Sequence, residues 1–255
     1  MTLPRMPSFR LDGRRALVTG AGRGIGLALA AGLAEAGAQV TLAARTAAEI
    51  EAGAEAIRAA GGQAEAAVLD VGDLAAVAAF FEARPAFNVL VNNAGTNRPK
   101  PMWEGTEDDF DAVIGLNVKS AFFVAQGCVK RMLAEGVKGG SLVHLGSQLG
   151  HVAIPGRALY CASKFALEGM NKAFALDLAP HGIRSNVIAP TFIETALTRP
   201  YFEDAAFKQS VIDRIKLGRI GQVEDLMGAA LFLASDASAL VTGTSLLVDG
   251  GWTAE

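Results

Sequence analysis

Short apolar runs alternate along the chain with longer stretches whose apolar residues recur at helical spacing. The apolar runs are 15–20, 39–44, 65–70, 87–95, 140–147, 183–190 and 243–251, and the helix-like stretches lie at 24–37, 46–60, 73–83, 107–134 and 157–179. The apolar runs lack polar alternation, which is typical of strands buried on both faces. This alternation predicts an α/β fold with a doubly wound parallel sheet of about seven strands, right-handed crossovers and helices on both faces.

No stretch has the composition of a linker, so we predict one domain over residues 1–255. The main irregularity is an insertion at about 190–221, which follows the sixth apolar run and contains the aromatic pair Tyr201 and Phe202. Long insertions at the carboxyl edge of such a sheet are often lids over ligands, so we interpret it as a substrate loop. The alternative is a segment that only covers the core or forms a subunit contact.

Composition excludes several classes of protein. Of the 255 residues, 51% are hydrophobic and 19% are charged, which provides a sizeable core and argues against disorder. The 23 basic and 26 acidic residues leave a net charge of −3, so nucleic acid is not an expected partner. The two cysteines, Cys128 and Cys161, lack the spacing of a zinc site or a disulfide framework, and no sequence cluster indicates a metal site.

The sequence gives no indication of a membrane protein. The start, MTLPRMPSFRLDGRR, has no apolar run of the signal-peptide type, and no later stretch is expected to be long enough to span a bilayer. A reducing, cytoplasmic setting fits these observations best.

The first apolar run leads into the glycine-rich segment TGAGRGIG, residues 19–26, and then directly into a helix-like stretch. Gly20, Gly24 and Gly26 allow a tight turn in which backbone N–H groups approach a pyrophosphate at the positive end of the helix dipole. The order of strand, glycine turn and helix predicts a phosphate site for a dinucleotide. The alternative is a tight turn without a ligand.

Tyr160 and Lys164 lie four residues apart in a helix-like stretch, so their side chains share one face. A phenol with an unperturbed pKa of ~10 can deliver a proton to a carbonyl oxygen, and a nearby positive charge helps it to ionise at neutral pH. Ser147, at the end of the fifth apolar run, can donate a hydrogen bond to the same oxygen. Spacing alone does not decide the matter, because Tyr and Lys at this spacing are common by chance.

Several motifs occur together in one order. They are the TGxxxGIG form of the glycine turn, NNAG at 92–95, Asn117 in LNVKSAF, Ser147 thirteen residues before Tyr160, and LVDGG at 247–251. On these residues the chain resembles the short-chain dehydrogenases/reductases over essentially its whole length, in particular the bacterial sugar/polyol dehydrogenases and 3-oxoacyl reductases. The resemblance implies a Rossmann-type fold, a nicotinamide cofactor and reversible oxidation of a hydroxyl to a carbonyl.

The resemblance also implies a catalytic set of Asn117, Ser147, Tyr160 and Lys164. Tyr160 would be the general acid/base, Lys164 would lower the pKa of its phenol and bind the nicotinamide ribose, and Ser147 would polarise the substrate oxygen. Asn117 would kink the long helix and hold a water that links Lys164 to solvent. In isolation, Asn117 is explained equally well as a buried amide that satisfies backbone groups.

Candidate cofactor-binding residues come from the glycine turn, the strand ends, NNAG and the catalytic helix. They are Gly20, Arg23, Gly24, Ile25, Gly26, Arg45, Asp70, Val71, Asn93, Ala94, Gly95, Tyr160, Lys164, Pro190, Ile193 and Thr195. No acid ends the second apolar run, where Arg45 stands, and Arg23 is a second cation. NADP(H) is therefore favoured over NAD(H), because guanidinium groups bind a 2′-phosphate. The alternatives are solvated surface arginines and, for Asp70, an ordinary helix N-terminal carboxylate instead of an adenine contact.

The chain departs from the family pattern at the start of the insertion. The family commonly has glycine after the proline that ends the sixth run, whereas Thr191 follows Pro190 here. A β-branched residue does not adopt positive φ cheaply, so the local path of the loop is expected to differ. This weakens the assignment of Ile193 and Thr195, by resemblance, to the nicotinamide amide.

Candidate substrate residues are Asn97, Gln148, His151 and Arg157, which flank NNAG, the serine and the tyrosine. This polar lining suits a hydroxylated, sugar-like or acidic small molecule, although exposed polar residues also serve solubility. The same motifs would serve a 3-oxoacyl thioester reductase. A cofactor-binding sensor or scaffold without turnover is a different class, but such proteins typically lose the tyrosine or the lysine.

Expected partners are a small-molecule substrate and further copies of the chain. The resemblance implies a homotetramer built through the helices near 107–134 and 157–179 and through the last strand. A mean hydropathy of +0.31 agrees with a chain that covers part of its surface in an assembly.

Overall fold

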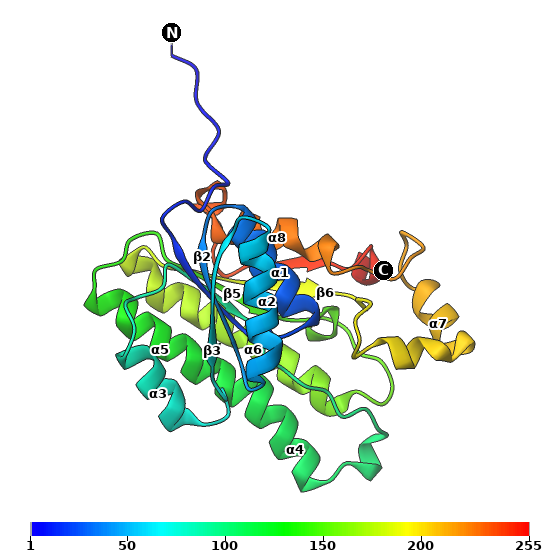
Figure 1. The fold of residues 1–255 in the computed structure, drawn as a ribbon. Helices are drawn as coiled ribbons and strands as arrows, with labels where there is room; N and C mark the ends of the chain where they lie inside the picture. The colour runs from blue at the N-terminus through cyan, green and yellow to red at the C-terminus, as the bar shows by residue number, and fades with distance from the viewer. Residues whose placement is uncertain (1, 255) are drawn as a thin grey trace.

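A computed structural model describes residues 2–254, in which seven parallel strands form one sheet with helices on both faces (Figure 1). The strands are β1 Arg15–Thr19, β2 Gln39–Ala44, β3 Gln63–Val68, β4 Val89–Asn92, β5 Ser141–Leu145, β6 Arg184–Pro190 and β7 Ser245–Val248. Their order across the sheet is β3-β2-β1-β4-β5-β6-β7. The chain runs outward from β1 to β3 and then returns to the other side at β4. The predicted doubly wound Rossmann-type fold is therefore confirmed.

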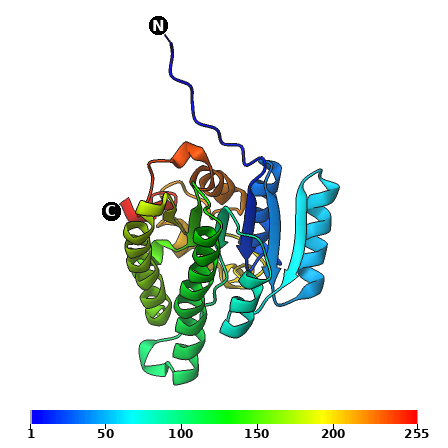
Figure 2. The ribbon, with the colours of Figure 1, turned by 90° about the vertical axis from the view of Figure 1, so that its left-hand side faces the viewer.

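Helices cover both faces of this sheet. They are α1 Gly24–Glu35, α2 Ala47–Ala59, α3 Leu74–Glu82, α4 Glu107–Ile114, α5 Ala121–Ala134, α6 Ala158–Leu178, α7 Ala205–Ile212 and α8 Glu224–Ala234. One core cluster, with Leu29, Ile50 and Leu226, packs α1, α2 and α8 on the sheet. Another, with Phe81 and Val124, packs α3 and α5 on it. Figure 2 shows the green run of α4 and α5 beside the yellow-green α6.

Strand β3 differs from the prediction. It spans Gln63–Val68 instead of 65–70, and its side chains alternate between exposed and less exposed positions. The reason is its place at the edge of the sheet, where one neighbour is missing and part of the surface is open. Asp70 therefore lies beyond the end of the strand.

The predicted helix at 107–134 is divided in the structure. A π-helical turn, Gly115–Ser120, separates α4 from α5 and contains the buried Asn117. A π turn widens the helix locally and is frequent at functional sites. The kink that the family resemblance implied near Asn117 takes this form.

The run Glu107–Ala134 also corrects one prediction. By length and composition alone it could cross a membrane, with a mean hydropathy of 1.5 in its most apolar window. The core helix of a soluble protein passes the same test. In the structure α4 packs on α6, and α5 packs on α3 and β4. The apolar residues of the run therefore contribute to contacts inside the protein.

The insertion at 190–221 packs as an aromatic cluster. The ring centroid of Phe192 lies 5.9 Å from that of Phe207 in α7 and 5.7 Å from that of Trp252. Trp252 begins a short 3₁₀ turn near the C-terminus, so the loop is fastened to the C-terminal segment. The loop therefore covers part of the core, and its first residues also border a cleft.

His144 is fully buried in β5. Its ring nitrogens lie 3.5 Å from Asn92 Nδ2 and 3.3 Å from Ser185 Oγ. Burial lowers the pKa of His144 from 6.5 to about 4, and the positive charge of Lys164 acts in the same direction. The folded protein therefore keeps this imidazole neutral where the unfolded chain would protonate it.

We expect acid to destabilise the protein through His144. A group whose pKa falls on folding contributes stability that is present above its unfolded pKa and lost as the pH falls toward its folded pKa. The free energy of unfolding should therefore fall between pH 6.5 and about 4, by about 2 kcal/mol at pH 5. Urea unfolding at several pH values measures this free energy. As the pH falls, it should decrease less steeply in His144→Gln than in the wild-type protein. His181→Gln, a change at an exposed site, should behave like the wild-type protein. An unchanged pH dependence in His144→Gln would contradict this account.

Candidate active site

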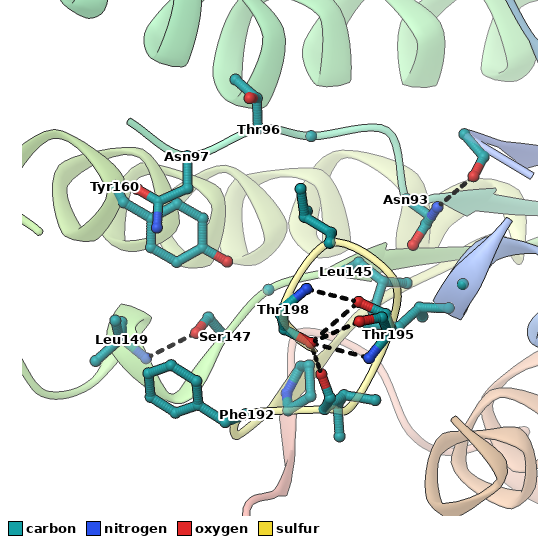
Figure 3. Close-up of a pocket in the computed structure, with 18 of the residues that line it drawn as sticks. Asn93, Thr96, Asn97, Leu145, Ser147, Leu149, Tyr160, Phe192, Thr195 and Thr198 are labelled. Atoms are coloured by element: carbon teal, nitrogen blue, oxygen red, sulfur yellow. Dashed lines mark hydrogen bonds between the residues drawn. The ribbon is translucent and has the colours of Figure 1, made fainter. Parts of the chain in front are cut away.

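The carboxyl ends of the central strands open onto a cleft of about 370 Å³. Its wall combines the glycine turn, the segment after β4, the loop after β5, the first turns of α6 and the start of the insertion (Figure 3). The structure brings together there most of the predicted site residues: Gly20, Arg23, Gly24, Ile25, Gly26, Asn93, Ala94, Gly95, Asn97, Ser147, Gln148, Arg157, Tyr160, Lys164, Pro190, Ile193 and Thr195.

The glycine turn has the shape of a phosphate cradle. Gly20 and Gly24 have φ angles of 63° and 57°, in the left-handed region. A Cβ on Gly26 would lie 2.3 Å from the carbonyl oxygen of Gly20, so this position tolerates only glycine. Arg23 precedes α1 without a side-chain cap, and the first turn of α1 has no acidic residue. The N-terminal N–H groups of α1 thus fit an anionic phosphate.

Hydrogen bonds join the NNAG segment to the glycine turn. Thr19 Oγ1 accepts from the backbone N–H groups of Asn93 at 3.1 Å and Ala94 at 3.2 Å. Asn93 Nδ2 donates to the carbonyl oxygens of Thr19 at 2.9 Å and Gly20 at 3.1 Å. Because this amide is used to hold β1 and β4 together, the segment presents a fixed wall to the cleft.

The predicted proton-transfer residues share this cleft. Tyr160 and Ser147 point into it from α6 and from the loop after β5 (Figure 3). The hydroxyl of Ser147 donates to Gln148 Oε1 at 2.9 Å and accepts from the N–H of Leu149 at 3.1 Å. Lys164 is buried, and its Nζ lies 5.4 Å from the centroid of the Tyr160 ring and donates to the Leu145 carbonyl at 2.6 Å.

Burial dominates the electrostatics of the pair. It raises the pKa of Tyr160 to about 12, against the opposing effect of the Ser147 hydroxyl. It lowers the pKa of Lys164 to about 8, against the opposing charge of Glu168 one helical turn further on. The charge of Arg157 also opposes the effect of burial on the Tyr160 pKa, and the lowering of the phenol pKa by Lys164 remains a prediction. The desolvation of the buried phenol outweighs the other effects.

Three predicted cofactor residues lie outside the wall of the cleft. Arg45 follows β2 and is exposed, and Asp70 and Val71 follow β3. Asp70 Oδ1 accepts from the N–H of Gly72 at 2.9 Å, a contact within the turn before α3, whose N-cap is Asp73. Val71 is buried in the core beneath the sheet edge. All three follow strands that end at the edge where the cleft opens, and their cofactor contacts remain a prediction.

Asn117 is tied to the cleft wall without lining it. Its Nδ2 donates to the Thr96 carbonyl at 2.8 Å and to Ser163 Oγ at 3.0 Å, and its Oδ1 accepts from the N–H of Thr96 at 2.8 Å. Asn117 thereby joins the segment after β4 to α6. These contacts are those of a buried amide that satisfies backbone groups, and the water relay remains a prediction.

His151 does not line the cleft, and its predicted contact with the substrate remains a prediction. Its Nε2 lies 2.9 Å from Ser245 Oγ and 3.3 Å from Glu168 Oε1. Ser245 belongs to β7, so the ring is held against the last strand of the sheet. The short turn after Ser147 directs consecutive side chains to different sides, and sequence proximity alone could not reveal this.

The structure adds cleft residues that the sequence analysis did not assign to the site, among them Thr191, Phe192, Leu197 and Tyr201. Thr191 Oγ1 is the single buried side-chain polar atom within residues 2–254 that lacks a hydrogen-bond partner. No residue other than glycine has a positive φ in that range, so Thr191 fits its backbone without strain. The signal that could have revealed Tyr201 was its place beside Phe202 in the insertion that the sequence predicted to be a substrate loop.

A family model described as enoyl-(acyl carrier protein) reductase matches residues 20–253, which include the glycine turn and the Ser147, Tyr160 and Lys164 positions. The chain belongs to the short-chain dehydrogenase/reductase family. It is 41% identical to gluconate 5-dehydrogenase of Gluconobacter oxydans, with 96% of each chain covered. It is 39% identical to D-erythrulose reductase of Gallus gallus, with 96% of this chain and 98% of the relative covered.

A solved structure agrees with this membership. The crystal structure of a gluconate 5-dehydrogenase from Burkholderia cenocepacia, in complex with NADP and tartrate, matches with a TM-score of 0.92 and 44% identity. The match covers 97% of this chain and 98% of that one. The protein is thus an NAD(P)-dependent oxidoreductase of the short-chain family, as its motifs predicted. Within residues 2–254, no group of three or more His, Cys, Asp or Glu side chains is arranged to hold a metal ion.

Proposed function

We propose that the protein interconverts a secondary alcohol and a ketone in a polyhydroxylated, sugar-like substrate with NADP(H), and that Tyr160 is the general acid/base. One observation carries the proposal: Tyr160, Ser147 and Lys164 line the same cleft as the glycine turn. A proton donor, a hydrogen-bond donor and a cation therefore surround one region where a reacting oxygen can bind.

The residues of the cleft fit a dinucleotide. The phosphate cradle of Gly20, Gly24 and Gly26 would hold the pyrophosphate, and Lys164 would hold the nicotinamide ribose. Ile193 and Thr195 would border the nicotinamide. When it is bound, the nicotinamide supplies or accepts the hydride.

The protein side chains handle the proton. In reduction, the hydroxyls of Ser147 and Tyr160 donate hydrogen bonds to the ketone oxygen, and Tyr160 transfers its proton as negative charge builds there. The phenolate that remains is stabilised by the ammonium of Lys164. In oxidation, the phenolate accepts the alcohol proton. Because burial raises the pKa of Tyr160 to about 12, this direction depends on positive charge near the phenol.

The substrate class is supported by the lining of the cleft and by the relatives. Asn97, Gln148 and Arg157 supply polar groups near Tyr160. Two relatives are named for gluconate and D-erythrulose, which both carry several hydroxyl groups. Polar groups at fixed positions in a cleft select substrates that can form hydrogen bonds with them.

A substrate panel tests the proposed activity. The purified protein is mixed with NADPH and with hydroxylated keto acids, neutral ketoses or an acetoacetyl thioester, and the loss of NADPH absorbance is followed. We expect faster turnover of hydroxylated ketones than of the thioester. Preference for the thioester would assign the protein to 3-oxoacyl reduction instead. Tight NADPH binding without turnover of any compound would favour a sensor.

We expect NADP(H) to be preferred because of Arg45 and Arg23. Arg45 is exposed at the end of β2, and Arg23 lies 3.7 Å from Glu49 in an exposed ion pair. Hydrogen bonds to a charged group are typically worth ~1.5–3 kcal/mol, so Arg45→Ala should lower kcat/KM for NADPH about 10-fold or more and change that for NADH little. The control is Arg58→Ala, an exposed arginine of α2 that pairs with Glu55. Wild-type kcat/KM for NADH equal to or above that for NADPH would contradict the assignment.

We also propose a homotetramer in the cytoplasm. Support for assembly comes from large apolar side chains that are exposed on the helices and strand of the predicted interfaces: Phe110, Leu133, Phe165, Leu176 and Leu247. Support for a reducing compartment comes from Cys128 and Cys161, which are both free thiols in the structure.

A further inference from the structure

The wall of the cleft carries positive charge only. Arg23, Arg157 and Lys164 line it, and no aspartate or glutamate does so in the described part of the chain. Arg23 belongs to the glycine turn and faces Glu49, and Lys164 donates to the Leu145 carbonyl. The third cation, Arg157, has only a long hydrogen bond to a backbone carbonyl and no carboxylate partner.

Arg157 lacks a counter-ion although it is partly buried. Its Nη1 donates to the carbonyl of the adjacent Gly156 at 3.2 Å, and its guanidinium lies 5.9 Å from the centroid of the Tyr201 ring. No carboxylate of residues 2–254 forms an ion pair with it. Most of the five guanidinium donors therefore have no partner in the protein.

The neighbouring cations behave differently. Arg98 pairs with Asp108 and Asp109, and Lys100 Nζ lies 2.6 Å from Asp109. These charges, which follow the NNAG segment, are neutralised within the protein. Arg157 is thus the cation of this region whose charge is left for a ligand.

The place of Arg157 is unfavourable unless an anion binds. It stands at the N-cap of α6, where the helix dipole is already positive, and its side chain makes no cap. Burial lowers the pKa of Arg157, and the groups that oppose this effect are Tyr201, Cys161 and Tyr160, none of them a carboxylate. Burial of a cation without compensation is costly, and a bound carboxylate would remove that cost.

We propose that Arg157 binds the carboxylate of a sugar acid, so that the enzyme prefers hydroxylated keto acids and aldonates to neutral ketoses and polyols. The guanidinium fork matches both oxygens of a carboxylate. Arg157 precedes Tyr160 by one helical turn, so it would hold the acidic end of the substrate while Tyr160 meets the reacting oxygen. This inference rests on the proposed function and adds a substrate class to it.

The kinetic test compares a hydroxylated keto acid with a neutral ketose of the same chain length. We expect the wild-type protein to favour the keto acid in kcat/KM by about 10-fold or more. Arg157→Gln should lower kcat/KM for the keto acid by about 10- to 100-fold, mainly through KM, and change that for the ketose little. Arg157→Lys should restore part of the loss, since it keeps the charge without the fork. Arg98→Gln, which alters a paired arginine, serves as the matched control.

A binding measurement keeps the test independent of turnover. Calorimetry with the NADP⁺-loaded protein measures the affinity for an aldonate and for the corresponding neutral polyol. Stronger binding of the aldonate that is lost in Arg157→Gln supports the inference. Equal binding of the two, or equal loss of both in Arg157→Gln, overturns it. Turnover of neutral ketoses alone would overturn this inference but leave the proposed function intact, whereas absence of all turnover with intact aldonate binding would overturn only the proposed function.

Discussion

We expect Tyr160→Phe to lower kcat by at least about 10²- to 10⁴-fold, which is the usual contribution of a positioned proton donor. Phenylalanine keeps the ring that packs at the start of α6 but removes the hydroxyl that points into the cleft beside Ser147. The fold and the affinity for NADPH should therefore be nearly unchanged. Steady-state kinetics and a fluorescence titration with NADPH separate the loss of chemistry from a loss of binding.

The matched control is Tyr201→Phe. Tyr201 is the only other tyrosine of the chain, and it lines the same cleft from the insertion. Its hydroxyl has no proposed part in proton transfer, so we expect kcat to change less than about 10-fold. Near-normal turnover in Tyr160→Phe would remove the proposed mechanism. Equal losses in the two variants would show that the effect is not specific to the proton donor.

We expect Lys164→Met to have the second-largest effect, a loss of at least about 10²-fold in kcat/KM for oxidation near neutral pH. Methionine retains the long apolar stem but removes the buried ammonium. The phenol of Tyr160, whose pKa burial raises to about 12, would then lack the ammonium that lies 5.4 Å from the centroid of its ring. Oxidation requires the phenolate, so its rate rises with pH until the phenol is ionised. The alkaline limb of the profile should move to higher pH in the variant.

Lys172→Met is the control for this change, because Lys172 is an exposed lysine two turns further along α6. It should leave both the rate and the pH profile as they are in the wild-type protein. The pH profile also distinguishes proton chemistry from a structural defect, since local unfolding would lower the rate without moving the limb. If Lys164→Met lowers the rate of oxidation without moving the alkaline limb of the pH profile, the electrostatic role of Lys164 is contradicted.

The sequence was sufficient for most of the fold because the central strands are buried on both faces. The runs that became β1 and β6 each contain three or more consecutive apolar residues and end at glycine or proline. β3 was placed two residues late, because an edge strand has polar positions that interrupt its apolar pattern. The π turn around Asn117 was not visible as such, because one extra residue in a turn hardly changes the helical pattern of the run.

The candidate site could be predicted where backbone chemistry or helical spacing fixes it. Gly20 and Gly26 follow from the shape of a phosphate turn, and Tyr160 and Lys164 follow from their spacing on one helix. The contact of His151 with Ser245 of β7 could not be predicted, because it joins residues that are distant in sequence. Tyr201 could not be assigned to the cleft either, because the path of a long insertion is set by contacts distant in sequence, such as that of Phe192 with Trp252.

The most direct measurement is a crystal structure of the protein with NADP⁺ and an aldonate bound. The account predicts that the hydroxyls of Tyr160 and Ser147 both lie within about 3.2 Å of one hydroxyl oxygen of the ligand. It also predicts that the nicotinamide faces the carbon that bears this oxygen. A ligand bound in the cleft with its hydroxyl groups out of reach of Tyr160, or a phenol turned away from Ser147, would contradict it.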